Sequence, residues 1–92
     1  MKYVMMFYRE DCGYCDMARR ALVELRDELP GLDLTRIQMV EETLEPDFAD
    51  QFDYYAVPSF YLDGEKLFEA HIGMRYEDMK REVRRVIEAA LA

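Results

Sequence analysis

The sequence has no long hydrophobic run and little else that would direct the chain to a membrane. A membrane-spanning helix requires about 20 apolar residues, and the longest apolar run, residues 3–8, is far shorter. The start of the chain is also a poor signal peptide, because no small-residue cleavage site follows this run. We therefore expect no membrane association and a cytoplasmic location.

Basic residues are scarce. Lys and Arg number 12 against 20 Asp and Glu, which gives a net charge of -8. A surface that binds nucleic acid needs a stripe of basic side chains to neutralise phosphates, so this balance argues against nucleic acid as a partner. The length of 92 residues predicts a single domain over residues 1–92, and an apolar content of 51% is enough to form one core. We expect this domain to be a monomer.

Cysteine is limited to two residues, Cys12 and Cys15. Small secreted domains that are held together by disulfides carry more cysteines and spread them along the chain. A bridge between Cys12 and Cys15 would close a very short loop and constrain the unfolded chain little. The spacing therefore favours chemistry over structural stabilisation.

The pattern of apolar and polar residues predicts four strands and three helices in the order β-α-β-α-β-β-α. The strands are expected at residues 3–8, 32–40, 59–62 and 67–72, and the helices after Cys12, from Glu45 and after Gly73. The first half is a βαβ unit with parallel strands, and Asp63-Gly64 predicts a hairpin in the second half. The predicted class is α/β, with a mixed four-stranded sheet flanked by helices on both faces.

All three predicted helices have a recognisable apolar face. On the first helix it is a stripe of residues at steps of three and four: Cys15, Ala18, Leu22, Leu25 and Leu29. Phe48, Phe52 and Tyr55 are expected to share the inward face of the second helix. The last helix should turn five side chains towards the sheet: Met79, Val83, Val86, Ile87 and Ala90.

The segment Cys12-Gly13-Tyr14-Cys15 lies where the first strand meets the first helix. At a helix N-terminus the unpaired N–H groups and the helix dipole stabilise a thiolate, which is the species that attacks a disulfide. Cys12 is therefore the predicted nucleophile. Cys15 lies one turn further along, where the buried stripe begins, and is predicted to resolve the mixed disulfide.

The cysteine pair has two other interpretations. The cysteines could be ordinary small residues near the end of a strand, although a C-x-x-C pair at this point of a βαβ unit is typical of a redox site. The pair could also bind zinc, which takes three or four protein ligands. His71 is the only histidine and is expected on the far hairpin strand, so no metal site is predicted.

Three features carry a family resemblance: the order of the elements, the segment Cys12-Gly13-Tyr14-Cys15 and the pair Val57-Pro58. In these features the chain resembles a glutaredoxin-like protein of the thioredoxin superfamily over nearly its whole length. The resemblance implies a thioredoxin-like fold and a cis peptide bond between Val57 and Pro58, where the backbone of Val57 pairs with the chain of the substrate. The resemblance also implies that Tyr14 and Gly73 bind the substrate. It implies that Arg9 holds a carboxylate of glutathione.

The chain departs from the family pattern at three positions. Gly13 stands where glutaredoxins usually have proline, and Met74 replaces the second glycine of a pair that begins at Gly73. Met6 stands where thioredoxins place a buried aspartate. The departures at Gly13 and Met74 weaken the glutathione signature and leave the dithiol intact.

The predicted function is a thiol-disulfide oxidoreductase that reduces protein disulfides through a mixed disulfide on Cys12. Its electrons would come from a flavin-dependent thioredoxin reductase or from glutathione as a co-substrate, and no bound cofactor is expected. Two alternatives remain open. One is a redox-responsive binding module of the same fold without turnover. The other is a metal or iron–sulfur site shared between two chains, each donating Cys12.

Overall fold

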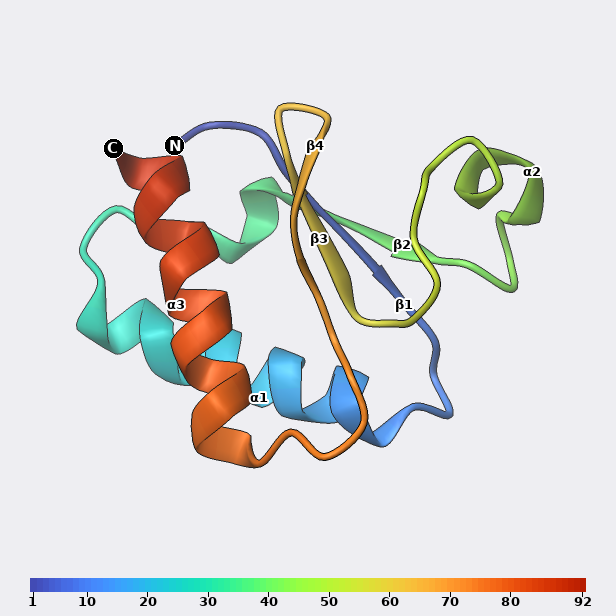
Figure 1. Ribbon diagram of the computed structural model, residues 1–92. Helices are drawn as coiled ribbons and strands as arrows, with labels where there is room; N and C mark the ends of the chain where they lie inside the picture. The colour runs from blue at the N-terminus through green and yellow to red at the C-terminus, as the bar shows by residue number, and fades with distance from the viewer.

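Four strands and three α-helices follow one another in the predicted order (Figure 1). The computed structural model describes residues 1–92. The strands are β1 (Val4–Tyr8), β2 (Ile37–Glu41), β3 (Ser59–Leu62) and β4 (Glu65–Glu69). The helices are α1 (Gly13–Glu28), α2 (Pro46–Ala49) and α3 (Tyr76–Leu91), with a short 3-10 helix, η1 (Leu34–Arg36), before β2. None of these helices has the length and apolar character needed to cross a membrane.

The strands form one mixed sheet in the order β2-β1-β3-β4. β1 runs parallel to β2, as the βαβ unit requires, while β3 is antiparallel to both β1 and β4. Phe7 near the end of β1 lies opposite Val40 of β2 and Ser59 of β3. The predicted mixed four-stranded sheet is therefore confirmed, and β1 is one of its two central strands.

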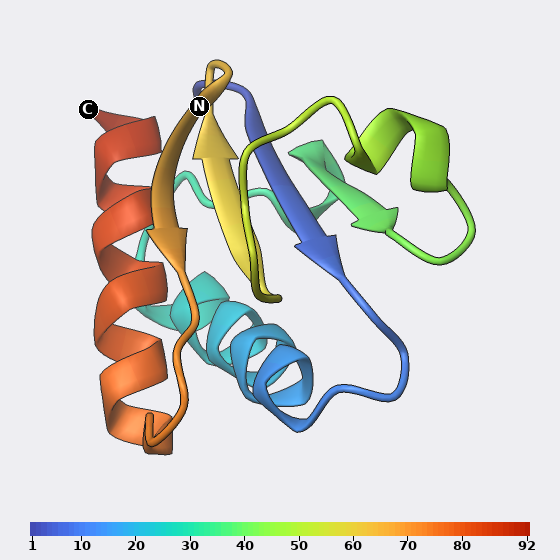
Figure 2. The same ribbon diagram turned by 45° about the vertical axis from the view of Figure 1, so that its right-hand side comes forward.

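Alternate residues of β1 face opposite sides of the sheet, and each side has its own core. Val4 and Met6 pack with α1 and α3 in a cluster of 17 buried residues. Met5 and Phe7 pack on the other side in a cluster of five, beside α2. Figures 1 and 2 both show α3 on one side of the sheet and α2 on the other. The fold is thioredoxin-like, with helices on both faces of the sheet.

The five predicted inward side chains of α3 are all buried, which confirms the apolar face of that helix. The prediction for Tyr55 is wrong, because its side chain is 90% exposed. Helix α2 ends at Ala49, so the helical spacing that would place Tyr55 beside Phe52 does not continue that far.

Two of the predicted strands, at residues 32–40 and 67–72, have the wrong boundaries. β4 ends at Glu69, so residues 70–72 leave the sheet and Ile72 is 94% exposed. The chain turns at Gly73, whose φ of 95° is in the left-handed region that glycine tolerates. At the other boundary β2 begins at Ile37, because the side chain of Asp33 caps the 3-10 helix over Leu34–Arg36.

Aromatic rings provide most of the cover on the α2 side of the sheet. Helix α2 has only four residues, so its backbone covers little of that surface. The Phe7 ring lies 4.7 Å from that of Tyr54, 4.9 Å from Phe52 and 5.6 Å from Tyr61 between centroids. Such ring pairs add to the free energy gained by burying the rings.

Truncating Phe7 is expected to destabilise the protein strongly. Phe7→Ala should lower the free energy of unfolding by about 3–5 kcal/mol, because it removes a buried ring that four other rings surround. Urea unfolding measures this difference. Tyr55→Ala is the control and should change stability by less than about 0.5 kcal/mol, because Tyr55 is exposed. A loss at Phe7 no larger than the loss at Tyr55 would contradict this account of the smaller core.

Candidate functional site

Cys12 is the N-cap residue of α1, and its sulfur takes part in the cap. The Cys12 Sγ accepts a hydrogen bond from the backbone N–H of Cys15 at 3.1 Å. Cys12 is half-buried, whereas Cys15 is fully buried, and both are free thiols. A sulfur at the N-terminus of a 16-residue helix accepts a hydrogen bond and lies at the positive end of the helix dipole, and both stabilise negative charge on it. Cys12 is thus placed to carry negative charge.

The environment of Cys15 keeps that sulfur protonated. Burial raises the pKa of the Cys15 thiol to about 12, and a hydrogen bond that this thiol donates to the Cys12 sulfur adds to the effect. A thiol of this kind is a poor nucleophile near neutral pH, because only the thiolate attacks. The two sulfurs therefore differ in exposure and in protonation, as expected of an accessible nucleophile and a buried resolving thiol.

Val57 and Pro58 lie against the dithiol although they are far from it in the sequence. The Cys12 thiol donates to the backbone carbonyl of Val57, with the sulfur 3.6 Å from the oxygen. The peptide bond between Val57 and Pro58 is cis, which confirms the bond that the family resemblance implies. The pairing of Val57 with a substrate chain stays a prediction.

Tyr14 and Gly73 lie together on the other side of the dithiol. The Gly73 N–H donates to the Tyr14 hydroxyl at 2.8 Å. This bond occupies the amide of Gly73. Met74, in place of the second glycine, is buried in the larger core. It also lines a shallow pocket of about 360 Å³ with Gly13, Tyr14 and Met17.

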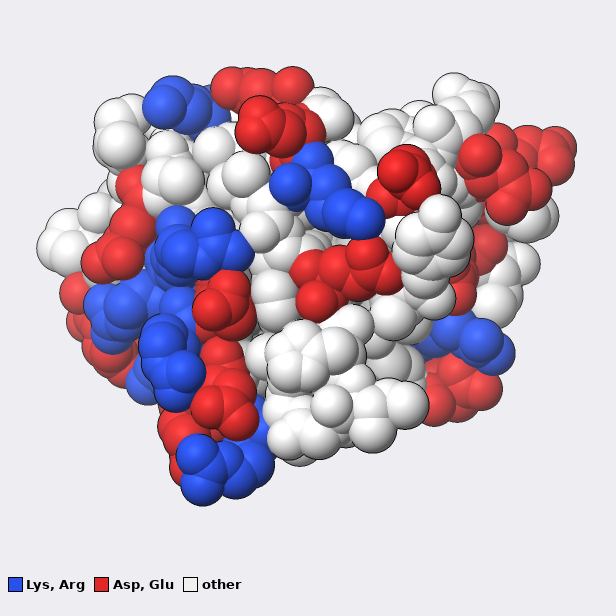
Figure 3. Space-filling view, viewed as in Figure 1, with Lys and Arg blue, Asp and Glu red and all other residues white.

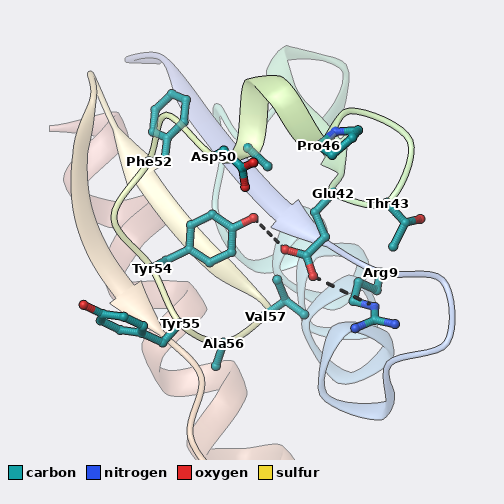
Figure 4. Close-up of a pocket in the computed structure, with 11 residues that line it drawn as sticks. Arg9, Glu42, Thr43, Pro46, Asp50, Phe52, Tyr54, Tyr55, Ala56 and Val57 are labelled. Carbon is teal, nitrogen blue, oxygen red and sulfur yellow. Dashed lines mark hydrogen bonds and ion pairs between the residues drawn. The ribbon is translucent and has the colours of Figure 1, made fainter.

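Arg9 lies at the edge of a second pocket, of about 550 Å³, which Val57 also lines (Figure 4). Its Nε atom is 3.3 Å from a carboxylate oxygen of Asp11 and 3.9 Å from one of Glu42. The Tyr54 hydroxyl donates to the other oxygen of Glu42 at 2.7 Å. Two carboxylates therefore lie beside the Nε of Arg9, while its two terminal nitrogens form no ion pair within the chain.

Charge is unevenly distributed around the site. Figure 3 shows basic side chains along α3, interleaved with acidic ones, and mostly acidic side chains over α2. The acids of α2 and the loops beside it include four that form no ion pair within the chain: Glu45, Asp47, Asp50 and Asp53. The side of the dithiol towards α2 is therefore strongly negative.

Glu41 is a residue of the site that the sequence pattern does not reveal. It is nearly buried at the end of β2. Its carboxylate accepts the Thr43 N–H at 2.6 Å, the Thr43 hydroxyl at 2.7 Å and the Glu10 N–H at 3.2 Å. The hydrogen bonds from Thr43, and a weaker one from Glu10, hold the pKa of Glu41 below its ordinary value. Glu41 thus fixes the loop that leads from β1 to Cys12.

No group of three or more His, Cys, Asp or Glu side chains is arranged to hold a metal ion. His71 is exposed and follows β4 instead of lying within it, which corrects its predicted place on the hairpin strand.

No protein-family model and no curated protein matches the chain. Among solved structures, mitochondrial thioredoxin 3 from Saccharomyces cerevisiae in its oxidized form is similar, with 26% identity and a TM-score of 0.56, over 89% of this chain and 76% of that one. A structure titled "Structure of a malarial protein" has a TM-score of 0.58 at 18% identity, over 97% and 96% of the two chains. The likeness to thioredoxin 3 supports the thioredoxin superfamily and does not single out its glutaredoxin-like members, while the second likeness supports the fold alone.

The difference between the two sulfurs predicts selective alkylation. Iodoacetamide at neutral pH should modify Cys12 in the reduced, folded protein and leave Cys15 unmodified, because Cys12 is accessible whereas Cys15 is buried and its pKa is raised. Peptide mass spectrometry identifies the modified residue. Unfolding in urea is the control and should expose both thiols. Similar rates at Cys12 and Cys15 in the folded protein would contradict the assignment.

The raised pKa also sets the sign of a pH effect. An unfolded thiol has a pKa of about 8.5. Burial of the neutral Cys15 thiol therefore stabilises the reduced protein fully below that pH, and the contribution is lost as the pH rises towards the folded pKa of about 12.

Proposed function

We propose that this protein is a thiol-disulfide oxidoreductase that reduces disulfide bonds in other proteins. The observation that carries the proposal is the arrangement of the two sulfurs. The Cys12 sulfur caps α1 beside the carbonyl of Val57, and Cys15 is buried one turn further along. The thioredoxin-like fold supports the same conclusion.

In the first step the Cys12 thiolate attacks one sulfur of the substrate disulfide. A bond forms between the Cys12 Sγ and that sulfur, and the substrate S–S bond breaks. The other substrate sulfur leaves as a thiolate and takes up a proton. The N-terminus of α1 stabilises the attacking thiolate and thereby lowers the cost of holding charge on Cys12.

In the second step Cys15 loses its proton and attacks the Cys12 Sγ. The Cys12–Cys15 bond forms, the mixed disulfide breaks, and the second substrate sulfur leaves as a thiolate that is protonated. Two electrons have then passed from the dithiol to the substrate. Before this step the backbone bond from the Cys15 N–H holds the Cys12 Sγ beside Cys15.

The substrate chain is proposed to bind along the backbone of Val57. The N–H of Val57 has no hydrogen-bond partner within the chain, and its carbonyl faces the reacting sulfur. An extended segment on either side of the substrate cysteine would use both groups, as in the addition of a strand to a sheet edge. Tyr14 and Gly73 would contact the substrate on one side and Arg9 on the other.

For the electron donor we favour a flavin-dependent thioredoxin reductase over glutathione. Glutathione presents two carboxylates, and the groups that would meet them already have contacts within the chain. Arg9 is paired with Asp11 and Glu42, and the Gly73 amide is bound to Tyr14.

We propose that the protein works as a monomer in the cytoplasm.

Substitution of each cysteine tests the mechanism. Cys12→Ser should abolish reduction of a protein disulfide such as insulin, because the nucleophile is lost. Cys15→Ser should accumulate a covalent mixed disulfide on Cys12, which non-reducing electrophoresis and mass spectrometry detect. Full activity of Cys12→Ser would exclude the assigned nucleophile. A wild-type protein that reduces no disulfide at all would leave the redox-responsive binding module as the better interpretation.

A recycling assay tests the donor. The oxidised protein should be reduced faster by thioredoxin reductase with NADPH than by glutathione at matched reducing capacity, because Asp11 and Glu42 compete with the carboxylates of glutathione for Arg9. Consumption of NADPH measures the first rate, and loss of the Cys12–Cys15 disulfide measures the second. Asp11→Asn is the matched variant and should improve the glutathione reaction by releasing Arg9. A faster reaction with glutathione in the wild type would overturn the preference.

A further inference from the structure

Glu69, the last residue of β4, holds the segment that precedes Val57. One oxygen of its carboxylate accepts the backbone N–H of Tyr55 at 2.6 Å and that of Ala56 at 2.7 Å. The other oxygen accepts the side-chain amine of Lys66 at 2.8 Å. Two consecutive amides are therefore bound to a single oxygen from a strand that lies beside β3. We call this arrangement the Glu69 clamp.

The carboxylate in the clamp is charged at neutral pH. Its burial acts to raise the pKa, but the hydrogen bonds from Lys66, Tyr55 and Ala56 outweigh burial, so the pKa of Glu69 lies below its ordinary value. Hydrogen bonds to a charged acceptor are about twice as strong as those between neutral groups. The clamp is therefore a firm attachment for a segment that belongs to no helix or strand.

The clamp also determines which backbone groups near the dithiol are left free. Glu69 occupies the amides of Tyr55 and Ala56, and the Ser59 hydroxyl donates to the carbonyl of Ala56 at 2.6 Å. Val57 follows directly, with an N–H that has no partner and a carbonyl 3.6 Å from the Cys12 Sγ. The first unbound amide after the clamp is thus the one beside the nucleophile. Figure 4 shows this segment along the rim of the pocket.

We propose that Glu69 is a positioning residue for disulfide exchange with polypeptide substrates, because its clamp presents the backbone of Val57 beside Cys12. The inference rests on the proposed function. Glu69 has no part in the exchange of sulfur bonds and acts only through the backbone of residues 55–57. A low-molecular-weight disulfide has no polypeptide chain to pair with Val57, so its reduction does not depend on the clamp.

The test compares two substrates across matched variants. We expect Glu69→Ala to lower kcat/KM for a disulfide-linked peptide about tenfold, chiefly through KM, the size of effect that follows from misplacing one backbone hydrogen bond. Reduction of 2-hydroxyethyl disulfide should be unchanged. Glu69→Gln should fall between the wild type and Glu69→Ala, because its amide oxygen still accepts hydrogen bonds but carries no charge. Glu65→Ala is the control, since Glu65 begins the same strand, is exposed and forms no ion pair.

A second measurement follows the clamp without turnover. Amide hydrogen exchange at Tyr55 and Ala56 should be slow in the wild type, faster in Glu69→Gln and fastest in Glu69→Ala, whereas exchange elsewhere in the sheet should not change. If Glu69→Ala does not fold, the Glu69→Gln variant decides the question.

The outcomes separate this inference from the function on which it rests. Equal losses on both substrates would show that Glu69 only stabilises the fold, and no loss on the peptide would show that the clamp is irrelevant. Either result overturns the inference while the oxidoreductase function stands. If the wild type reduces neither substrate, the proposed function fails, and the positioning role fails with it.

Discussion

Burial of β1 on both faces is the constraint on which the geometry of the site depends. Val4, Met5, Met6 and Phe7 are all buried, so the strand must lie inside the sheet with a neighbour on either side. The directions of the neighbours then determine which chain ends meet. β1 and β2 end at the same edge of the sheet, β3 begins there, and β4 ends there.

Each strand contributes one group to that edge. β1 leads to the nucleophile Cys12, and β2 ends with Glu41, which fixes the loop before that cysteine. Val57 and Pro58 directly precede β3, and Glu69 ends β4 and holds the segment of Val57. Residues separated by up to about sixty positions are thereby collected by a sheet whose register is set by its apolar faces. The chemistry lies in loops, and the sheet positions the loops.

The sequence predicts the parts of this arrangement that depend on local pattern. The element order, the buried stripe of α1 and the position of Cys12 at a helix start all follow from spacing. The cis bond at Val57-Pro58 was expected only from family resemblance, because most X-Pro bonds are trans. The predictions for Tyr55 and Ile72 are wrong because an apolar residue beyond the end of a helix or strand can continue the apolar spacing of that element. Glu41 and Glu69 were not found, since their partners are backbone amides in other segments, which leave no trace in the spacing of side chains.

The two cores of unequal size have a consequence for motion. Cys15 lies in α1, whose buried residues Ala18, Ala21, Leu22 and Leu25 belong to the cluster of 17, whereas Val57 packs against the cluster of five. Proteins open locally in cooperative units, and units with few buried contacts open at a lower free energy than the whole molecule. The nucleophile and the backbone that is proposed to receive the substrate therefore rest on different cores. Local opening of the smaller core would displace the segment of Val57 while the dithiol remained folded on its helix.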